Sequence, residues 1–155
     1  MRNSKNFLFP MGKNSRERGN IMAWFAAFLA FVVVPLAALT IDIVRAFYVY
    51  THLQAATDAA CEAAAQALDA PTFIRTGVQQ IDLGLGSSYA SREFAGAVVD
   101  QGVVQYSPAL NGMRLLSPTK VECRASASLT LLVPSVSPAL TVRVASTSEL
   151  RVNRR

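Results

Sequence analysis

The sequence predicts an α+β fold with a single N-terminal transmembrane helix that continues as a long helical stalk. A small exported domain follows, with one further helix and a C-terminal antiparallel β hairpin or small sheet. Three observations predict this: residues 21–41 carry no charge, no Pro or Gly lies between Pro35 and Pro71, and apolar residues alternate with polar ones from residue 121 onward. The expected segments are a basic cytoplasmic tail (1–19), a transmembrane helix and alanine-rich stalk (20–68), a linker (69–86) and a small extracytoplasmic α+β domain (87–155).

The apolar run at residues 21–41 is long enough to cross a hydrocarbon core of about 30 Å as a helix. It is longer than the apolar core of about 7–15 residues in a cleaved signal peptide, so we expect a permanent anchor. Pro35 is tolerated in membrane helices and predicts a modest bend. Trp24 near one end of the run, and Tyr48 and Tyr50 near the other, fit the aromatic belts of membrane interfaces.

Basic residues are concentrated before this run. Residues 1–20 hold five basic groups and one acid, which accounts for +4 of the formal net charge of +5. Because positive charge favours the cytoplasmic side, we expect a cytoplasmic N-terminus and an exported chain from residue 42 onward. The rest of the chain is nearly neutral and has no basic face with interleaved aromatics, which argues against a nucleic-acid partner. The lipid bilayer is the expected partner of the apolar run.

The alanine-rich segment after the run is expected to stay helical to about Leu68, because alanine has the highest helix propensity. Its alanines recur every four residues, which lets another helix backbone approach closely. The predicted contact stripe consists of Gln54, Ala55, Asp58, Ala59, Ala63 and Ala67, with Ala56, Ala60 and Ala64 beside it. We expect it to bind other membrane proteins through helix packing, as a homo-oligomer or hetero-oligomer. Alternatively it packs on the protein's own C-terminal domain, and different faces can do both.

Asp42 is the first acid after the apolar run, and Arg45 lies three residues later on the same helix face. The two side chains can form an ion pair where the helix leaves the membrane. An exposed pair of this kind contributes only roughly a few tenths of a kcal/mol.

Residues 70–86 mix Pro, Gly and polar residues and read as a linker with at most one short turn. The Gly84-Leu85-Gly86 stretch within it predicts a turn ahead of a helix and not a phosphate-binding loop. Ser87 or Ser88 is the expected N-cap of a second helix, which should end near Gly102.

Two runs with a period of two predict strands, at residues 121–131 and 140–144. The proline-containing segment 134–138 is the expected loop between them. Because a lone hairpin is marginal in water, its apolar face must be covered by the second helix, by the alanine-rich stalk or by an additional strand near residues 103–106.

The chemistry-bearing side chains are few. Two cysteines and one histidine do not make a zinc pattern, and we expect no metal or cofactor. Cys61 and Cys123 either form a disulfide in an oxidising compartment or remain buried thiols. His52 has no nucleophile near it in sequence, and Asp58 and Glu62 resemble a solvated helix face more than a pair of catalytic carboxylates. We therefore expect that the protein is not an enzyme.

The segment "RGNIMAWFAAFLAFVVVPLAALTIDIVRAFYVYTHLQAATDAACEAAAQAL" resembles the N-terminal module of the TadE/TadG-like proteins of bacterial tight-adherence (Flp-type) pilus systems. The matching positions are Gly19, Pro35, Asp42, Arg45, Leu53, Gln54, Ala56, Asp58, Ala59, Ala60 and residues 63–65. The closing stretch "VECRASASLTLLV...LTVRVASTSEL" is also similar to the β hairpin of many short members. The resemblance implies a single-pass protein of the bacterial cytoplasmic (inner) membrane that serves as a pilus assembly component or minor pilin-like subunit. The alternative is a membrane-tethered envelope binding or sensor module unrelated to pili.

Two departures from the family pattern limit what the resemblance implies. Pilin-like members are cut after a glycine and carry Glu at the fifth mature position, whereas cleavage between Gly19 and Asn20 would place Trp24 there. The sequence therefore leans toward the TadG-like members, without processing. The D-x-S-x-S metal motif of larger TadG-like proteins does not occur, so no metal site is carried over.

Overall fold

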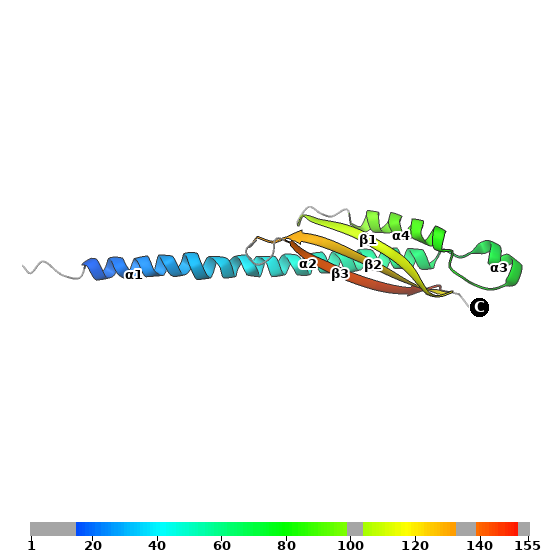
Figure 1. Cartoon of the computed structure of the whole chain (residues 1–155), viewed down its shortest axis with the longest axis horizontal. Coiled ribbons are helices and arrows are strands. Elements are labelled where there is room, and N and C mark those ends of the chain that lie inside the picture. Colours follow the sequence, from blue (N-terminus) through cyan, green and yellow to red (C-terminus); the bar gives the residue numbers. More distant parts are fainter. Residues whose placement is uncertain (1–14, 99–103, 133–138, 152–155) are drawn as a thin grey trace, which may run out of the picture. The chain divides into compact units, whose positions relative to one another are not determined.

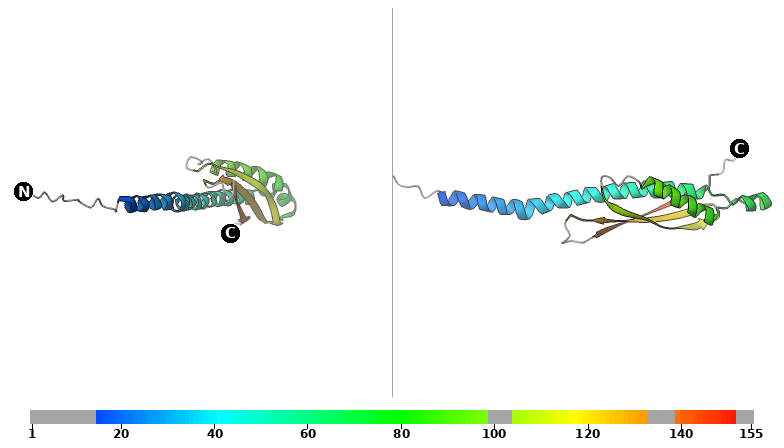
Figure 2. Two further views of the ribbon diagram at one scale, coloured as in Figure 1. Left: turned by 60° about the vertical axis from the view of Figure 1, so that its left-hand side comes forward. Right: turned by 90° about the horizontal axis from the view of Figure 1, so that it is seen from above.

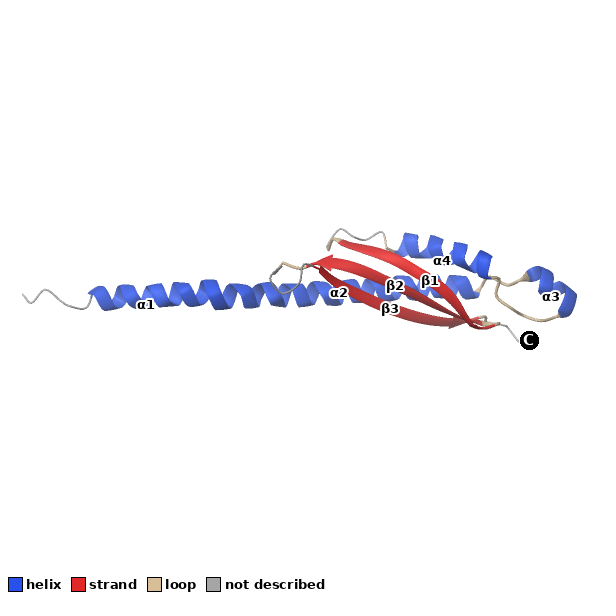
Figure 3. Cartoon of the chain, viewed as in Figure 1, coloured by secondary structure: helices blue, strands red, loops and turns tan. Residues whose placement is uncertain are grey.

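The computed structural model describes residues 15–98, 104–132 and 139–151 and divides into two units, Met1–Ala38 and Leu39–Arg155. Figure 1 labels its elements along the chain, and Figure 3 colours them by type. The helices are α1 (Ser15–Phe28), the π-helical segment η1 (Leu29–Val33), α2 (Val34–Ala65), α3 (Ala70–Thr76) and α4 (Leu83–Ala97), and the strands are β1 (Tyr106–Ser117), β2 (Lys120–Thr130) and β3 (Ala139–Glu149). The predicted fold class, α+β with a long N-terminal helix and a C-terminal antiparallel sheet, is confirmed.

The described part of the first unit is helical, and none of the apolar side chains described there is buried. Its π-helical segment η1 directly precedes Pro35, and the N–H of Val34 donates to the carbonyl of Leu29, five residues back. A proline ring lacks an N–H and clashes with the carbonyl four residues earlier, which here is that of Phe31. The wider π turn provides room for the ring without ending the helical path.

The second unit is a two-layer structure in which α2 and α4 cover one face of a three-stranded antiparallel sheet (Figure 2). The strand order is β1-β2-β3, so that β2 is central. The predicted alternation is confirmed on β2, where one face is buried and the other carries polar side chains. The buried side chains of β2 are Val121, Cys123, Ala125, Ala127 and Leu129, and they meet Val49, Leu53, Ala56, Ala60, Cys61 and Ala64 of α2 in one core.

The first strand was the least predictable part of this sheet. Only residues 103–106 were expected to extend the hairpin, whereas β1 begins at Tyr106 and continues to Ser117. Pro108 and Gly112 interrupt its pattern, and the register shifts between Leu110 and Gly112. Both residues are tolerated because β1 is an edge strand. An edge strand accepts the missing N–H of Pro108 and the bulge at Gly112. Residue 103, like the predicted loop 134–138, lies outside the described residues.

The segment predicted as a linker contains a capped helix, α3. The Asp69 carboxylate accepts hydrogen bonds from the backbone N–H of Thr72 at 3.0 Å, from its hydroxyl at 2.7 Å, and from Gln80 Nε2 at 2.7 Å. These hydrogen bonds hold the pKa of Asp69 below its usual range, and the bond from the Thr72 hydroxyl has the largest effect. The helix ends at Gly77, whose φ of +69° is readily adopted only by glycine.

Helix α4 begins earlier than predicted. Its N-cap is Asp82, whose carboxylate accepts from the N–H groups of Gly84 and Leu85 at 2.8 and 3.1 Å, so the expected N-cap at Ser87 or Ser88 was wrong. The two serine hydroxyls instead donate to backbone carbonyls one turn back. The glycines expected in a turn lie inside the helix. Helix α4 ends at Ala97 with Val98 as its C-cap, and the expected end at Gly102 lies outside the described residues.

Candidate helix-contact and membrane-proximal site

Helix α2 presents two parallel rows of alanines to different surroundings. Ala56, Ala60 and Ala64 are at most 1 % exposed and pack on the sheet, whereas Ala55 and Ala59 are exposed on the opposite side. One row thus serves the protein's own core, and the other remains open.

The exposed side of α2 holds most of the predicted contact stripe. We call Gln54, Ala55, Asp58, Ala59 and Ala63 the outer stripe. Gln54 and Ala63 are half-buried, and Gln54 Nε2 donates to Asp58 Oδ1 at 2.9 Å across one helical turn. The polar pair is satisfied within the stripe, and the two exposed alanines leave its backbone accessible. Ala67 does not belong to the outer stripe, because α2 ends at Ala65 and Ala67 is buried beneath α4.

Asp42 joins the start of the second unit's helix to the end of β2. Its side chain is 5 % exposed, and its two carboxylate oxygens accept the Leu132 N–H at 3.0 and 2.9 Å. Arg45 Nη1 donates to Asp42 Oδ1 at 3.2 Å and to the Thr130 carbonyl at 3.3 Å. The pair was expected to be exposed, and the structure instead buries the carboxylate. The reason is the Leu132 backbone, which lies 90 residues away in sequence and leaves no local signal.

An apolar groove lies beside this pair, between α2 and β3. Its volume is about 330 Å³, and it is lined by Ile43, Ala46, Phe47, Tyr50 and Val142. Sequence reasoning missed the groove, although the spacing of its α2 residues is that of a single helix face. Phe47 is 68 % exposed, which is unusual for an aromatic side chain of a folded domain.

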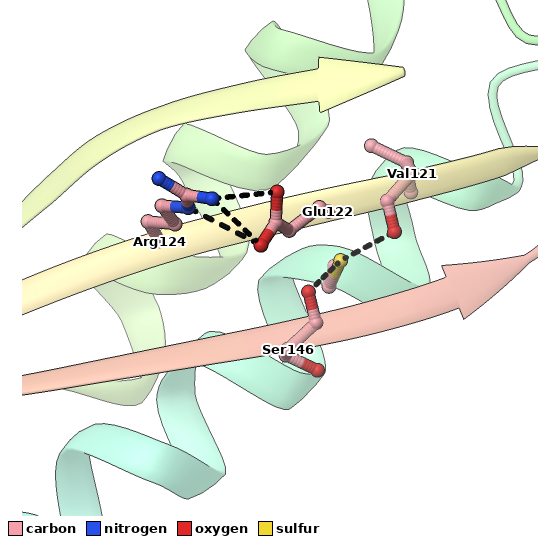
Figure 4. Close-up of polar contacts among 5 residues, drawn as sticks. Val121, Glu122, Arg124 and Ser146 are labelled. Carbon is pink, nitrogen blue, oxygen red and sulfur yellow. Dashed lines mark hydrogen bonds and ion pairs between the residues drawn. The ribbon is translucent and has the colours of Figure 1, made fainter. Parts of the chain in front are cut away.

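The two cysteines face each other across the core. Both are buried free thiols, and Cys61 Sγ donates to the carbonyls of Val121 at 3.6 Å and Ser146 at 3.4 Å. Figure 4 shows these two carbonyl groups, on neighbouring strands, converging on the sulfur. Ser146 is the direct cross-strand partner of Cys123. The hydrogen bond with Cys61, together with burial, raises the pKa of Cys123. The disulfide stays a prediction.

The remaining candidates do not assemble a catalytic or metal site. His52 is half-buried and its ring contacts Tyr48, with the centroids 4.2 Å apart. Within residues 15–98, 104–132 and 139–151, no group of three or more His, Cys, Asp or Glu side chains could hold a metal ion. Glu62 is 3.8 Å from Arg151 Nη2 in an exposed ion pair. Gly19 and Asn20, the possible processing site, both lie inside α1.

The described part of the chain contains one helical segment, Asn20–Ala65, that is long and apolar enough to cross a membrane. Together with the small α+β unit, this defines a class: proteins that carry a compact domain on a single N-terminal apolar helix. In the comparison with family models, residues 19–67 match the model of putative Flp pilus-assembly TadE/G-like proteins. No curated protein and no solved structure matches the chain.

The matched segment contains both parts of the candidate site on α2, the outer stripe and the Asp42–Arg45 pair. It confirms the TadE/TadG-like resemblance of the N-terminal module and supports a role related to Flp pilus assembly. The elements α3, α4 and the sheet lie beyond the match.

Proposed function

We propose that this protein is a non-enzymatic, membrane-anchored component of a Flp/Tad-type pilus system, acting either in pilus assembly or as a minor pilin-like subunit. Its N-terminus lies in the cytoplasm, and its second unit lies outside the bacterial cytoplasmic membrane. The observation that carries the proposal is the family match over residues 19–67, on a helix whose Ala55 and Ala59 are left exposed by its own domain.

The two alanine rows of α2 support a helix-packing function. Because Ala56, Ala60 and Ala64 already contact the sheet, the domain does not need Ala55 and Ala59 for its own stability. Small exposed side chains at a spacing of four residues let a partner helix approach closely, so that van der Waals contacts and backbone contacts add up along the stripe. The partner is therefore another pilin-like or pilus-assembly protein with a helix of its own.

The orientation follows from the distribution of charge. Residues 1–20, before the apolar run, contain five basic groups and one acid. The positive-inside tendency keeps such a segment in the cytoplasm. A reporter enzyme that is active only outside the cytoplasm, fused after residue 151, is expected to be active, and the same reporter fused before residue 15 is expected to be inactive.

The central test replaces the two exposed alanines by leucine, in the double variant Ala55→Leu/Ala59→Leu. The added side chains project outward, so folding and membrane insertion are expected to be normal while pilus formation falls at least several-fold, measured by counting surface pili. The matched control is Ala95→Leu, because Ala95 is an exposed alanine of a helix away from the stripe. Ala60→Leu is expected to lower the protein level itself, since Ala60 is fully buried.

Normal piliation by the double variant at a normal protein level would argue against the outer stripe as the contact surface. Normal piliation by a strain that lacks the protein would argue against a pilus role altogether and favour the envelope binding or sensor module.

A further inference from the structure

We propose that the second unit is seated on the membrane itself, through an apolar collar that lies in the headgroup layer. The collar consists of Ile43, Phe47 and Tyr50 on α2 and Leu132 and Leu140 at the adjoining ends of β2 and β3. This inference rests on the proposed function, because it requires the apolar run at residues 21–41 to span the bilayer.

The collar residues are exposed although they are large and apolar. Their exposed fractions are Ile43 49 %, Phe47 68 %, Tyr50 48 %, Leu132 55 % and Leu140 38 %. They gather at one end of the unit, because the Leu132 N–H is bonded to Asp42 and because Val142, two residues after Leu140, lines the groove with the α2 residues. A group of large apolar side chains exposed at one end of a unit marks a contact with a protein or a membrane.

Asp42, the first acid after the apolar run, does not interrupt this surface. Asp42 is 4 % exposed, and its carboxylate is occupied by the Leu132 N–H and the Arg45 guanidinium. The apolar exterior therefore continues past the point where hydropathy alone ends the membrane segment.

Charge favours an anionic lipid surface over other occupants. At this end of the unit we count the described residues 39–50, 104–110, 127–132 and 139–143. The charged residues among them are Asp42, which is buried, and the bases Arg45 and Arg143. The acids on α2 beyond residue 50, and Glu122 and Glu149 on the strands, lie toward the opposite end. An apolar collar with one exposed base, Arg143, and with its acid buried against Arg45 is complementary to anionic lipid headgroups.

The length of the apolar helix agrees with this placement. Residues 21–41 number 21, which as a helix at 1.5 Å per residue corresponds to about 32 Å. The hydrocarbon core takes about 30 Å, and the bilayer with its headgroup layers about 40–45 Å. Residues 21–41 are therefore enough to cover the core, and Ile43, the first collar residue, follows them in the sequence after Asp42. Tyr50 is of the residue type that is enriched at this level.

The test uses tryptophan as a depth probe in the full-length protein. In a Trp24→Phe background, which removes the single native tryptophan, Phe47→Trp and Leu140→Trp report on the collar and Thr147→Trp serves as the control on β3, far from it. The proteins are reconstituted in vesicles of phosphatidylethanolamine and phosphatidylglycerol that contain lipids brominated on the acyl chains.

We expect the bromolipids to quench the two collar tryptophans several-fold more than the control, and aqueous acrylamide to show the reverse order. Equal quenching of all three tryptophans by acrylamide would overturn the inference. Protection from both quenchers, with a crosslinked dimer, would assign the collar to a second copy of the chain and would also overturn it. Replacing phosphatidylglycerol by phosphatidylcholine should weaken bromolipid quenching at Leu140→Trp, and Arg143→Gln should remove that difference; an unchanged signal would overturn the part played by Arg143.

An alkaline carbonate wash separates this inference from the proposed function. Release of the protein by the wash would contradict the membrane anchor and hence the proposed function. Retention of the protein together with water-exposed collar tryptophans would contradict the collar alone.

Discussion

The role of Asp42 is set by its backbone partner more than by its ionic one. The Arg45 ion pair spans three residues of one helix, but the bonds to the Leu132 N–H tie α2 to the end of the central strand. A carboxylate that accepts from a backbone N–H and a guanidinium makes charge-assisted bonds, which are shorter and stronger than neutral ones. The residue that ends the uncharged run therefore acts as a structural connection.

Replacing this carboxylate tests the connection. Asp42→Asn keeps the shape but presents an amide NH₂ toward one donor and removes the charge opposite Arg45, so the free energy of unfolding should fall by about 1–3 kcal/mol. The measurement is denaturant unfolding of the full-length protein in detergent. Asp58→Asn is the matched control, because Asp58 is exposed and bonded only to Gln54 among the described contacts; its effect should stay within about 0.5 kcal/mol. Equal losses in the two variants would contradict the connection.

A second prediction at the scale of single residues concerns the thiols of Cys61 and Cys123. In an oxidising compartment, Cys61 and Cys123 should give up two protons and two electrons to the disulfide of a thiol–disulfide oxidoreductase and become joined. Both side chains are fully buried in the folded unit, so the bond must form while the sheet closes on α2. Chain entropy suggests a stabilisation on the order of 4 kcal/mol for a loop of about sixty residues.

Non-reducing electrophoresis of protein isolated from membranes should show a faster band than the reduced sample, and a thiol assay after unfolding should find no free thiol. Cys61→Ala provides the control, since it should migrate identically with and without reductant. Two titratable thiols in protein unfolded without reductant would contradict the disulfide.

At the scale of single elements, α4 is placed by a glycine. A Cβ at Gly86 would lie 3.2 Å from the Ala64 carbonyl oxygen and 3.1 Å from Met113 Cε, whereas nothing lies within 4 Å of a Cβ at Gly96. The Met113 side chain can move, but the carbonyl belongs to the backbone of α2. The absence of a side chain at Gly86 therefore sets how closely α4 packs on α2 and β1.

The two glycines make a matched pair of variants. Gly86→Leu should destabilise the protein by about 1–3 kcal/mol, because overpacking forces backbone shifts. Gly96→Leu should stabilise it slightly, by up to about 1 kcal/mol, because leucine is the better helix former at an open position. Thermal unfolding of both variants in the same detergent gives the comparison. A stable Gly86→Leu protein would mean that the contact between α4 and α2 is looser than the structure has it.

The elements that could be predicted from the sequence are those with a strong local period. The uncharged run and the alternation from Val121 to Leu129 each have one dominant pattern, and they were correctly assigned to a helix and a strand. Strand β1 could not be recognised in this way, because Pro108 and Gly112 break its alternation and an edge strand tolerates both. The start of α4 was misplaced because two serines and Asp82 are all acceptable N-caps, and the sequence alone does not show that Asp82, next to the buried Ile81, is the one used.

The candidate site could be predicted only in part for a related reason. The two alanine rows of α2 have the same four-residue spacing: one contains Ala55 and Ala59, and the other Ala56 and Ala60. Periodicity therefore cannot say which row packs on the sheet. The groove on the same helix was detectable from spacing alone, but its wall on β3 was not. Contacts between segments far apart in sequence, such as that between Asp42 and Leu132, leave no trace in either partner.

At the scale of the whole molecule, the described apolar residues fall into two populations, one exposed and one buried in a core. Every described buried apolar residue lies between Val49 and Val144, within the second unit, and the described residues 20–38 contribute none. The first unit thus has its apolar side chains available for lipid, while the stability of the second comes from its own core. Helix α2 serves both, since residues beyond Tyr50 are held by the sheet and do not depend on a membrane for their conformation.

This division predicts that the second unit folds without the membrane segment. A fragment of residues 39–155 loses no described buried side chain, so its denaturant unfolding in mild detergent should be cooperative, with a free energy within about 1 kcal/mol of the full-length protein. It should still need detergent to stay monodisperse, because Ile43, Phe47 and Tyr50 remain exposed. A fragment of residues 60–155 is the control, and it should be unfolded because it lacks Val49, Leu53 and Ala56 of the core. If the longer fragment melts without a transition while the full-length protein unfolds cooperatively, the stability of α2 must come from the membrane segment and not from the sheet.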